Sequence, residues 1–252
     1  WWKPTVLYVQ DINWLPESFL KHIKPLVQMI VGQNACPLAQ NLDLGAYDLL
    51  LTSLPHYVEK FKQMGTKAEY FPIGFDKRLL RNNNISKSRP YELTFVGGLG
   101  GYHSKGTEIL SKIADELPLK VWGYGGQQLP EGSTLRQRWQ GEAWAEEMYD
   151  LLAKSQITIN RHIDIAECYA NNMRLYEATG MGACLLTDAK TNLGHLFEPD
   201  HEVVTYSTPA EAISKLKELI ANPKEAAKIA AQGQLRTLKN HTYRHRIGQL
   251  VR

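Results

Sequence analysis

Two charged residues stand near the start of a segment that has the pattern of a helix. Arg174 and Glu177 are three residues apart, so they share one helix face within the first two turns, and Asn171 or Asn172 would be a good N-cap. A cation near a helix N-terminus is unfavourable unless an anion is present, and a carboxylate accepts hydrogen bonds from neighbouring sugar hydroxyls. The pair therefore predicts a site for a phosphorylated sugar, such as a nucleotide; an ordinary surface ion pair is the alternative.

A glycine-rich segment is the second candidate binding element. Gly97 and Gly98 open the run GGLGG between a strand-like segment and a helix-like one, and Lys105 falls in the first turn of that helix. Glycines let backbone N–H groups approach an anion, and the helix N-terminus adds free donors. The spacing fits neither a dinucleotide-binding fingerprint nor a P-loop, so a plain flexible turn is the alternative.

Three residues are candidates for a catalytic role. His162 follows a strand end, where ligands bind in open parallel sheets, and Glu167 and Arg174 lie in the polar segment after it. No catalytic base can be assigned from these positions. The chain has no GxSxG or HExxH motif, and its three cysteines form no CxxC pair, so serine hydrolases, zinc proteases and metal sites are not expected.

The elements that carry these residues alternate between strands and helices. Strands are predicted at 6–9, 27–31, 48–52, 68–72, 93–96, 119–122, 157–160, 183–187 and 203–205, and helices at 16–23, 55–64, 104–117, 142–154, 172–181, 209–220, 223–239 and 243–251. The strands are continuous apolar runs, which indicates an α/β fold with doubly wound parallel sheets. The polar run 73–91 predicts a linker, giving domains at 1–85 and 86–252. Four strands are few for a complete first domain, so we expect that domain to be truncated and the chain to be a fragment.

Composition excludes several classes of protein. The 252 residues are 43% hydrophobic and 22% charged, as in an ordinary globular protein. A net charge of +3, from 29 basic and 26 acidic residues, is too small for a nucleic-acid-binding footprint. No apolar run approaches the roughly 18 residues that span a bilayer, and no signal peptide is evident, so a cytoplasmic protein without a transmembrane segment is expected.

The chain resembles the GT-B glycosyltransferases, and most of all the CgeB-like, spore-maturation branch of glycosyltransferase group 1. The resemblance rests on the segment NNMRLYEATG at 171–180, the strand CLLTD at 184–188, the tail His241-Thr242-Tyr243 with Arg246, and YDLLLTS at 47–53. It implies two Rossmann-like domains that face a cleft, the N-terminal one on the acceptor side and the C-terminal one binding a nucleotide-sugar.

The same resemblance implies roles for particular residues. Glu177 would accept from the ribose hydroxyls, and Lys105 and Arg174 would offset the diphosphate charge. The backbone that faces the diphosphate would come from Gly97, Gly98, Asn171, Asn172 and Met173, and Gly141 would lie where relatives contact the base. Many retaining members carry two glutamates separated by seven residues; Tyr169 stands at the first of these positions here, with Glu167 two residues away, which leaves retention in doubt.

The resemblance implies a hexosyltransferase-like enzyme of glycan biosynthesis. It would use a UDP-, GDP- or dTDP-sugar without a bound metal or other cofactor, because basic residues and helix dipoles stabilise the leaving diphosphate. Its acceptor, a glycan, protein or small molecule, is unidentified. The alternatives are a GT-B sugar-nucleotide epimerase and a non-catalytic, nucleotide-sugar-binding fragment that works with other domains of a longer polypeptide.

Overall fold

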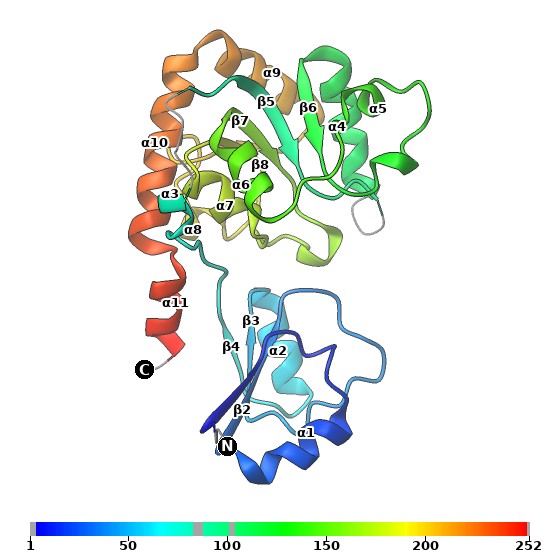
Figure 1. The fold of residues 1–252 in the computed structure, drawn as a ribbon, viewed down its shortest axis with the longest axis vertical. Coiled ribbons are helices and arrows are strands. Elements are labelled where there is room, and N and C mark those ends of the chain that lie inside the picture. Colours follow the sequence, from blue (N-terminus) through cyan, green and yellow to red (C-terminus); the bar gives the residue numbers. More distant parts are fainter. Residues whose placement is uncertain (1–3, 83–87, 101–103, 251–252) are drawn as a thin grey trace. The chain divides into compact units, whose positions relative to one another are not determined.

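The structure is a computed structural model that describes residues 4–82, 88–100 and 104–250, without the side chains of residues 81, 82, 104 and 105. The chain divides into two compact units, residues 1–73 and residues 74–252, called here the first and second units. Each has its own parallel sheet (Figure 1).

The first unit is a four-stranded parallel sheet in the order β1-β2-β3-β4. Its strands are β1 (Val6–Val9), β2 (Met29–Asn34), β3 (Leu49–Thr52) and β4 (Ala68–Tyr70), and its helices are α1 (Glu17–Ile23), the 3-10 turn η1 (Lys24–Leu26) and α2 (Pro55–Gln63). Ile30, Leu50 and Phe61 are fully buried, so strand and helix side chains form the core of this unit. Proline at the first position of α2 suits a helix start, where its missing N–H is not needed.

The second unit is a five-stranded parallel sheet in the order β6-β5-β7-β8-β9. The strands are β5 (Tyr91–Val96), β6 (Leu119–Trp122), β7 (Ser155–Asn160), β8 (Cys184–Asp188) and β9 (Val204–Tyr206). The helices are α3 (Leu79–Asn82), α4 (Ser104–Glu116), α5 (Thr134–Arg138), α6 (Ala145–Ala153), α7 (Arg174–Gly180), α8 (Leu193–Leu196), α9 (Pro209–Ala221), α10 (Pro223–Asn240) and α11 (Tyr243–Leu250), with 3-10 turns η3 (Gly126–Gln128) and η4 (Asp164–Ala166).

The strand order of the second unit fixes where a ligand can bind. From β5 the chain moves outward to β6 and then returns to the other side of β5 to form β7. Adjacent connections therefore run in opposite directions and leave a crevice outside the carboxyl ends of β5 and β7. Both the glycine-rich segment after β5 and the polar segment after β7 begin at this crevice.

The predicted parallel α/β architecture is confirmed, but the division between the units falls after Ile73 instead of after residue 85. The reason is the pairing of Phe75 with the C-terminal segment. The Phe75 N–H donates to the carbonyl of His241 at 2.7 Å, and the Tyr243 N–H donates to the carbonyl of Phe75 at 3.0 Å. The Phe75 ring also packs on Gly180, where an added Cβ would come within 2.7 Å of it.

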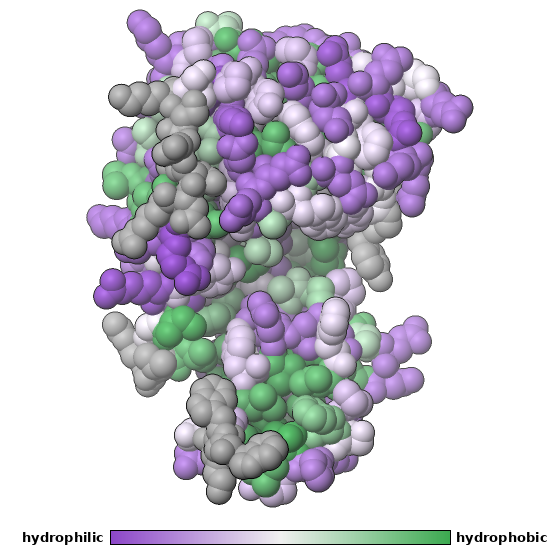
Figure 2. All heavy atoms as spheres, viewed as in Figure 1, coloured by the Kyte–Doolittle hydropathy of each residue, from purple (hydrophilic) through white to green (hydrophobic). Residues whose placement is uncertain are grey.

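Side-chain chemistry on the surface differs between regions. Among the exposed large apolar residues of the first unit, five lie on β1, on α1 and around the start of β2: Val6, Tyr8, Phe19, Leu26 and Met29. In Figure 2 hydrophobic residues gather on the visible face of the first unit, whereas the second unit presents mostly hydrophilic residues on the face in view. Within the described ranges, no helix combines the length and the apolar character needed to cross a membrane.

A buried histidine joins α10 to α11. His241 Nε2 lies 2.8 Å from the carbonyl of Leu196, and Nδ1 lies 2.9 Å from Nη2 of Arg246. Because a guanidinium only donates, Nδ1 accepts and Nε2 carries the proton, so the ring is neutral. Burial lowers the pKa of His241 to about 4.

We expect acid to destabilise the second unit through this histidine. The unfolded chain binds the proton below the ordinary pKa of about 6.5, whereas the folded chain binds it only near 4. The free energy of unfolding is therefore unaffected by the titration of His241 above pH 6.5. It falls by on the order of 3 kcal/mol as the pH drops toward 4. Urea unfolding across this range measures it. The control is His241→Gln, which keeps a donor and an acceptor but does not titrate; an equal pH dependence in that variant would contradict the assignment.

Candidate active site

A pocket lies at the carboxyl ends of β5, β6 and β7, where the strand order reverses. Its volume is about 440 Å³, within the range of small-molecule sites. The residues that line this switch-point pocket are Phe95, Val96, Gly97, Gly98, Gly123, Tyr124, Ala143, Trp144, Ala145, Met148, Tyr149, Asn160, Arg161, Asn172, Met173, Arg174 and Glu177. All of them belong to the second unit.

Arg174 and Glu177 form a buried ion pair in the wall of this pocket. Arg174 Nη1 lies 2.7 Å from Glu177 Oε2, and the two side chains are only 14% and 7% exposed. Arg174 Nε also donates to the carbonyl of Val96, at the end of β5, at 2.9 Å. The shared helix face is as predicted, but the pair is not a surface pair, and Glu177 neutralises much of the charge of Arg174.

The carboxylate of Glu177 is held from a second side by Tyr149. The Tyr149 hydroxyl donates to Glu177 Oε1 at 3.0 Å. Burial, followed by the charge of Glu177, raises the pKa of Tyr149, so the phenol stays protonated and remains a donor. Each carboxylate oxygen has more than one acceptor position, so Glu177 can still accept hydrogen bonds from a ligand.

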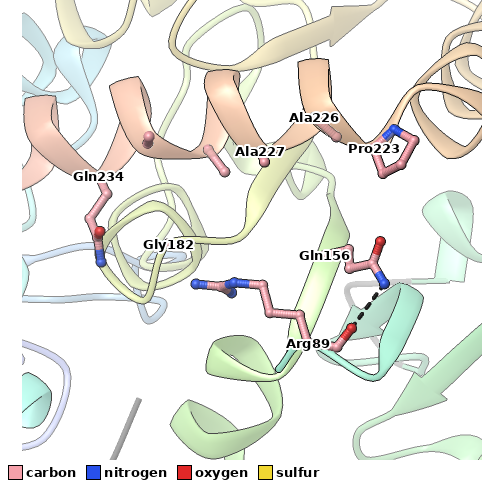
Figure 3. A pocket seen from close by; sticks show the side chains of 9 residues that line it. Arg89, Gln156, Gly182, Pro223, Ala226, Ala227 and Gln234 are labelled. Atoms are coloured by element: carbon pink, nitrogen blue, oxygen red, sulfur yellow. Dashed lines mark hydrogen bonds between the residues drawn. The ribbon is translucent and has the colours of Figure 1, made fainter. Parts of the chain in front are cut away.

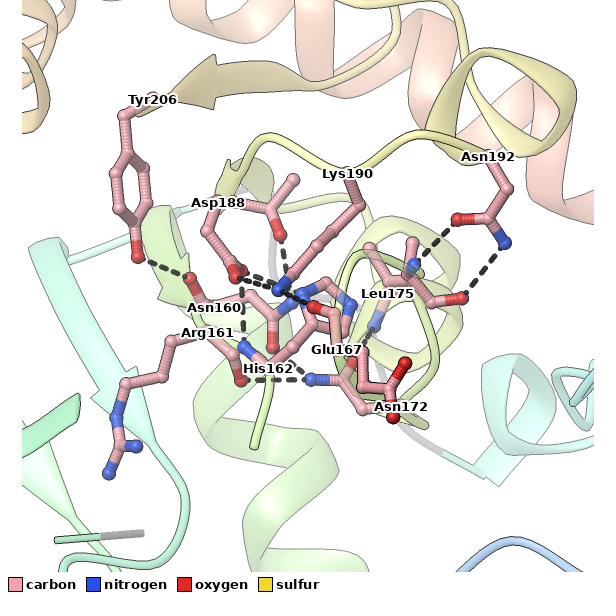
Figure 4. A network of polar contacts seen from close by, with 12 residues as sticks. Asn160, Arg161, His162, Glu167, Asn172, Leu175, Asp188, Lys190, Asn192 and Tyr206 are labelled. Atoms are coloured by element: carbon pink, nitrogen blue, oxygen red, sulfur yellow. Dashed lines mark hydrogen bonds and ion pairs between the residues drawn. The ribbon is translucent and has the colours of Figure 1, made fainter. Parts of the chain in front are cut away.

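A chain of amide hydrogen bonds fixes the first turn of α7 to the sheet (Figure 4). Asn172 Oδ1 accepts from the N–H of Leu175 at 3.2 Å, so its side chain caps the first turn from one position before the N-cap residue, Met173. Asn172 Nδ2 donates to Asn160 Oδ1 at 2.6 Å, and Asn160 Nδ2 donates to Thr187 Oγ1 at 2.9 Å. The ends of β7 and β8 thereby set the direction in which Arg174 and Glu177 point.

Arg161 is a pocket residue that the sequence did not single out. It is 7% exposed, and Nη2 donates to the carbonyl of Gly98 at 2.9 Å. Its Nε is buried without a hydrogen-bond partner, and no carboxylate of the described residues lies within 4.0 Å of the guanidinium. Burial accordingly lowers the pKa of Arg161.

The guanidinium of Arg161 lies across the first turns of α4. A Cβ added to Gly106 would overlap Nη1 of Arg161, so only glycine leaves room for this arrangement. A cation at a helix N-terminus is unfavourable, and so is a buried cation without a counter-charge. Both costs fall when an anion occupies the pocket, so Arg161 is a candidate anion-binding residue.

Two aromatic rings form the outer rim of the switch-point pocket. Tyr124 and Trp144 are stacked, with ring centroids 5.7 Å apart and planes at 9°. Trp144 is 60% exposed, and its Nε1 donates to Glu142 Oε2 at 2.9 Å. Trp139, by contrast, packs against the hydrophobic core. The rim therefore offers a flat apolar surface beside a polar interior.

Comparison with known families decides the class of protein. A profile of proteins described as glycosyl transferase-like matches residues 106–252, which is more than half of the chain. The chain belongs to this glycosyl transferase-like family. No curated protein sequence matches it.

Solved structures share the fold of this glycosyl transferase-like chain over almost its whole length. Sucrose-phosphate synthase from Thermosynechococcus elongatus superposes with a TM-score of 0.68 over 98% of this chain and 73% of that one, at 12% identity. Alr3699/HepE from Anabaena, in complex with UDP-glucose, gives 0.68 over 98% and 77%, at 15% identity. A glycosyltransferase from Rickettsia africae gives 0.68 over 98% and 75%, at 9% identity. The predicted GT-B fold class is thus confirmed.

The pocket of the glycosyl transferase-like chain contains most of the expected donor-binding positions. Those that line it are Gly97, Gly98, Asn172, Met173, Arg174 and Glu177. Asn171 is buried next to them without lining the pocket, and the carbonyl of Gly141 accepts from the N–H of Gly123 at 2.9 Å, behind the pocket wall. The side chain of Lys105 lies outside the described part of the structure.

The other two catalytic candidates are not among the lining residues. The ring of His162 is buried, and its Nδ1 lies 2.6 Å from Asp188 Oδ1 (Figure 4). Although burial opposes it, the hydrogen bond with His162 lowers the pKa of Asp188, which favours a charged partner for the ring. Glu167 is exposed, and its carbonyl accepts from Lys190 Nζ at 2.6 Å. Both residues hold the segment between β7 and α7 in place.

Proposed function

We propose that this protein transfers a sugar from a nucleotide-sugar, bound in the switch-point pocket, to an acceptor. The observation that carries the proposal is the buried guanidinium of Arg161, which makes no ion pair with a described carboxylate within 4.0 Å and lines the same pocket as the buried carboxylate of Glu177. Arg161 would bind an anion, and Glu177 would accept from a pair of hydroxyls. A nucleotide supplies both groups, in its diphosphate and its ribose. The CgeB-like motif around these residues agrees with that assignment.

The proposal gives each part of the pocket a role. The diphosphate binds Arg161 and the backbone of Gly97 and Gly98, with Lys105 nearby in sequence. The ribose hydroxyls donate to Glu177, and the base stacks on the rim formed by Tyr124 and Trp144. Arg174 orients Glu177 through their ion pair instead of binding phosphate itself.

The chemistry of transfer follows from where charge develops. As the bond from sugar to diphosphate breaks, negative charge accumulates on the leaving oxygen. Arg161 and the N-terminus of α4 place fixed positive charge there, and fixed charge at the point where charge develops stabilises the transition state. In the proposed transfer, groups of the protein supply the positive charge that stabilises the leaving diphosphate, so no metal ion is needed. We assign His162 to positioning, because its ring is directed at Asp188.

Calorimetric titration of the full chain with UDP, GDP, dTDP and uridine tests the proposal. UDP is the first probe, because Alr3699/HepE was solved with UDP-glucose. We expect one diphosphate to bind much more tightly than its nucleoside, with or without Mg²⁺. Release of glucose from UDP-glucose then distinguishes a transferase from a module that only binds the donor. Equal, negligible binding of all four probes would contradict the proposal.

The fit between Gly106 and Arg161 provides a test that removes no polar group from the chain. In Gly106→Ala the new methyl group meets Nη1, Cδ and Cζ of Arg161, so the guanidinium has to leave its position, while helix propensity rises. We expect diphosphate affinity to fall by about tenfold, since one charge-assisted hydrogen bond is lost. Calorimetry measures this, and Gly248→Ala on α11, where a Cβ meets no atom, is the control. Unchanged affinity would show that the position of Arg161 does not matter.

A further inference from the structure

A second cavity lies at the opposite edge of the same sheet. Its volume is about 370 Å³, and it is formed where β7 and β8 begin, beneath one face of α10 (Figure 3). Since the strands are parallel, their amino ends are one strand length away from the switch-point pocket. The cavity is therefore separate from the proposed donor site and shares no lining residue with it.

A guanidinium without a counter-charge enters this cavity. Arg89 Nη1 donates to the carbonyls of Ser155 and Leu152, at 2.9 Å and 3.4 Å, and Nη2 donates to the carbonyl of Met181 at 3.0 Å. Nε makes no hydrogen bond with the described residues, and none of their carboxylates lies within 4.0 Å of the guanidinium. Burial lowers the pKa of Arg89, and no acidic group opposes that shift.

The contacts of Arg89 show which of its donors remain. A guanidinium carries five N–H groups, and three of them are directed at the carbonyls of Leu152 on α6, Ser155 at the start of β7 and Met181 after α7. The two left over are Nε–H and one Nη2–H, because no hydrogen bond from Nε to a described residue is present and Nη2 makes a single one. Two such donors of a guanidinium can bind two oxygens of a carboxylate or phosphate.

The remaining walls leave room for a compact ligand body. Four alanines of α10, at 226, 227, 230 and 231, form one side, and Gly182 keeps the opposite side open. Gln156 and Gln234 each donate to a backbone carbonyl at 2.9 Å, and each keeps its amide oxygen for another partner. Small apolar walls with two amides suit a small polar molecule, and the volume is within the range of ligand sites.

We propose that this Arg89 cavity binds a small molecule through an oxyanion, a phosphate or a carboxylate, which accepts from Nε and Nη2 of Arg89. The alanine face of α10 packs on the body of the ligand. The site is independent of the proposed donor site, and its occupant compensates the charge that the fold leaves unpaired. Neither the family match nor the structural comparisons assign a ligand to this cavity.

Thermal unfolding of the full chain in increasing inorganic phosphate or acetate, at constant ionic strength, tests the proposal. A ligand of the folded state raises the midpoint by about 3–6 °C at roughly ten times its dissociation constant. Ala227→Glu places a carboxylate on the cavity wall facing Arg89 and should abolish the increase. Ala210→Glu, at an exposed position of α9, is the matched control and should keep it. The better of the two probes identifies the oxyanion.

Phosphate could also raise the unfolding midpoint by binding in the proposed donor site. The variant Arg161→Gln distinguishes the two sites, because it changes the donor site alone. If the Arg89 cavity binds the probe, the increase survives in Arg161→Gln and is lost in Ala227→Glu and in Ala231→Glu. If the increase is lost in Arg161→Gln and kept in both alanine variants, the anion binds only in the switch-point pocket and the inference is wrong. It is equally wrong if neither probe raises the midpoint of the unmodified chain.

Discussion

Replacing Arg161 by glutamine is expected to weaken nucleoside diphosphate binding by about 10- to 100-fold while leaving the free energy of unfolding unchanged or higher. The loss of affinity corresponds to charge-assisted hydrogen bonds between a guanidinium and phosphate oxygens. The free energy of unfolding of the variant is not expected to fall, because a buried cation without an ion-pair partner opposes folding when no ligand is present.

Calorimetry with UDP and uridine, together with urea unfolding without ligand, measures both effects. Uridine lacks the diphosphate, so its binding should change little. Arg138→Gln, at an exposed position of α5, removes the same charge outside the pocket and is the control. If Arg161→Gln unfolds easily and weakens UDP and uridine equally, the residue has a structural role and the diphosphate assignment is wrong.

Local patterns in the sequence predicted the elements well. Residues 119–122 form β6 as expected, and the helix expected at 209–220 is α9 (Pro209–Ala221). These features depend on neighbours within a few positions: apolar runs, prolines at helix starts and a capping asparagine before α7. The helix expected from residue 142 begins only at Ala145, because Trp144 before it has an extended backbone. Errors of this size arise where the ends of an element depend on packing.

Long-range contacts account for what the sequence did not reveal. Arg161 gains its role from Gly98 and Gly106, more than fifty residues earlier in the chain. His162 looked like a ligand of the site because it follows a strand end, but Asp188 at the end of the next strand holds its ring. Neighbouring residues after one strand thus take opposite directions, and only the packing of the sheet decides which one enters the pocket.

The same reasoning applies to the boundary between the units. Residues 73–91 read as a linker because they are polar, yet Phe75 within them is 1% exposed and pairs with the segment after α10. The packing of Phe75 on Gly180 places this residue in the second unit, although the residues around it are polar. Average polarity locates a connection between domains but does not show which of its residues pack on a partner far along the chain.

The buried pair of Arg174 and Glu177 should show strong coupling in stability. We expect Arg174→Met and Glu177→Met each to lower the free energy of unfolding by about 3 kcal/mol, since each leaves the other charge buried and unpaired. The double variant replaces both by apolar side chains of similar size, so it should lose less than the sum, with a coupling of about 2–3 kcal/mol. The exposed pair Glu108 and Lys112 on α4 is the control, for which about 0.5 kcal/mol is expected.

Nucleoside binding should not follow stability in this series, and that separates the two roles of Glu177. If its carboxylate accepts from the ribose hydroxyls, uridine affinity falls by at least about tenfold in Glu177→Met and stays low in the double variant, although stability recovers. In Arg174→Met the carboxylate persists, still held by Tyr149, so affinity falls less. Calorimetry on the four proteins gives the answer. Uridine affinity that recovers together with stability in the double variant would mean that Glu177 only supports the fold, and the ribose would have to bind elsewhere.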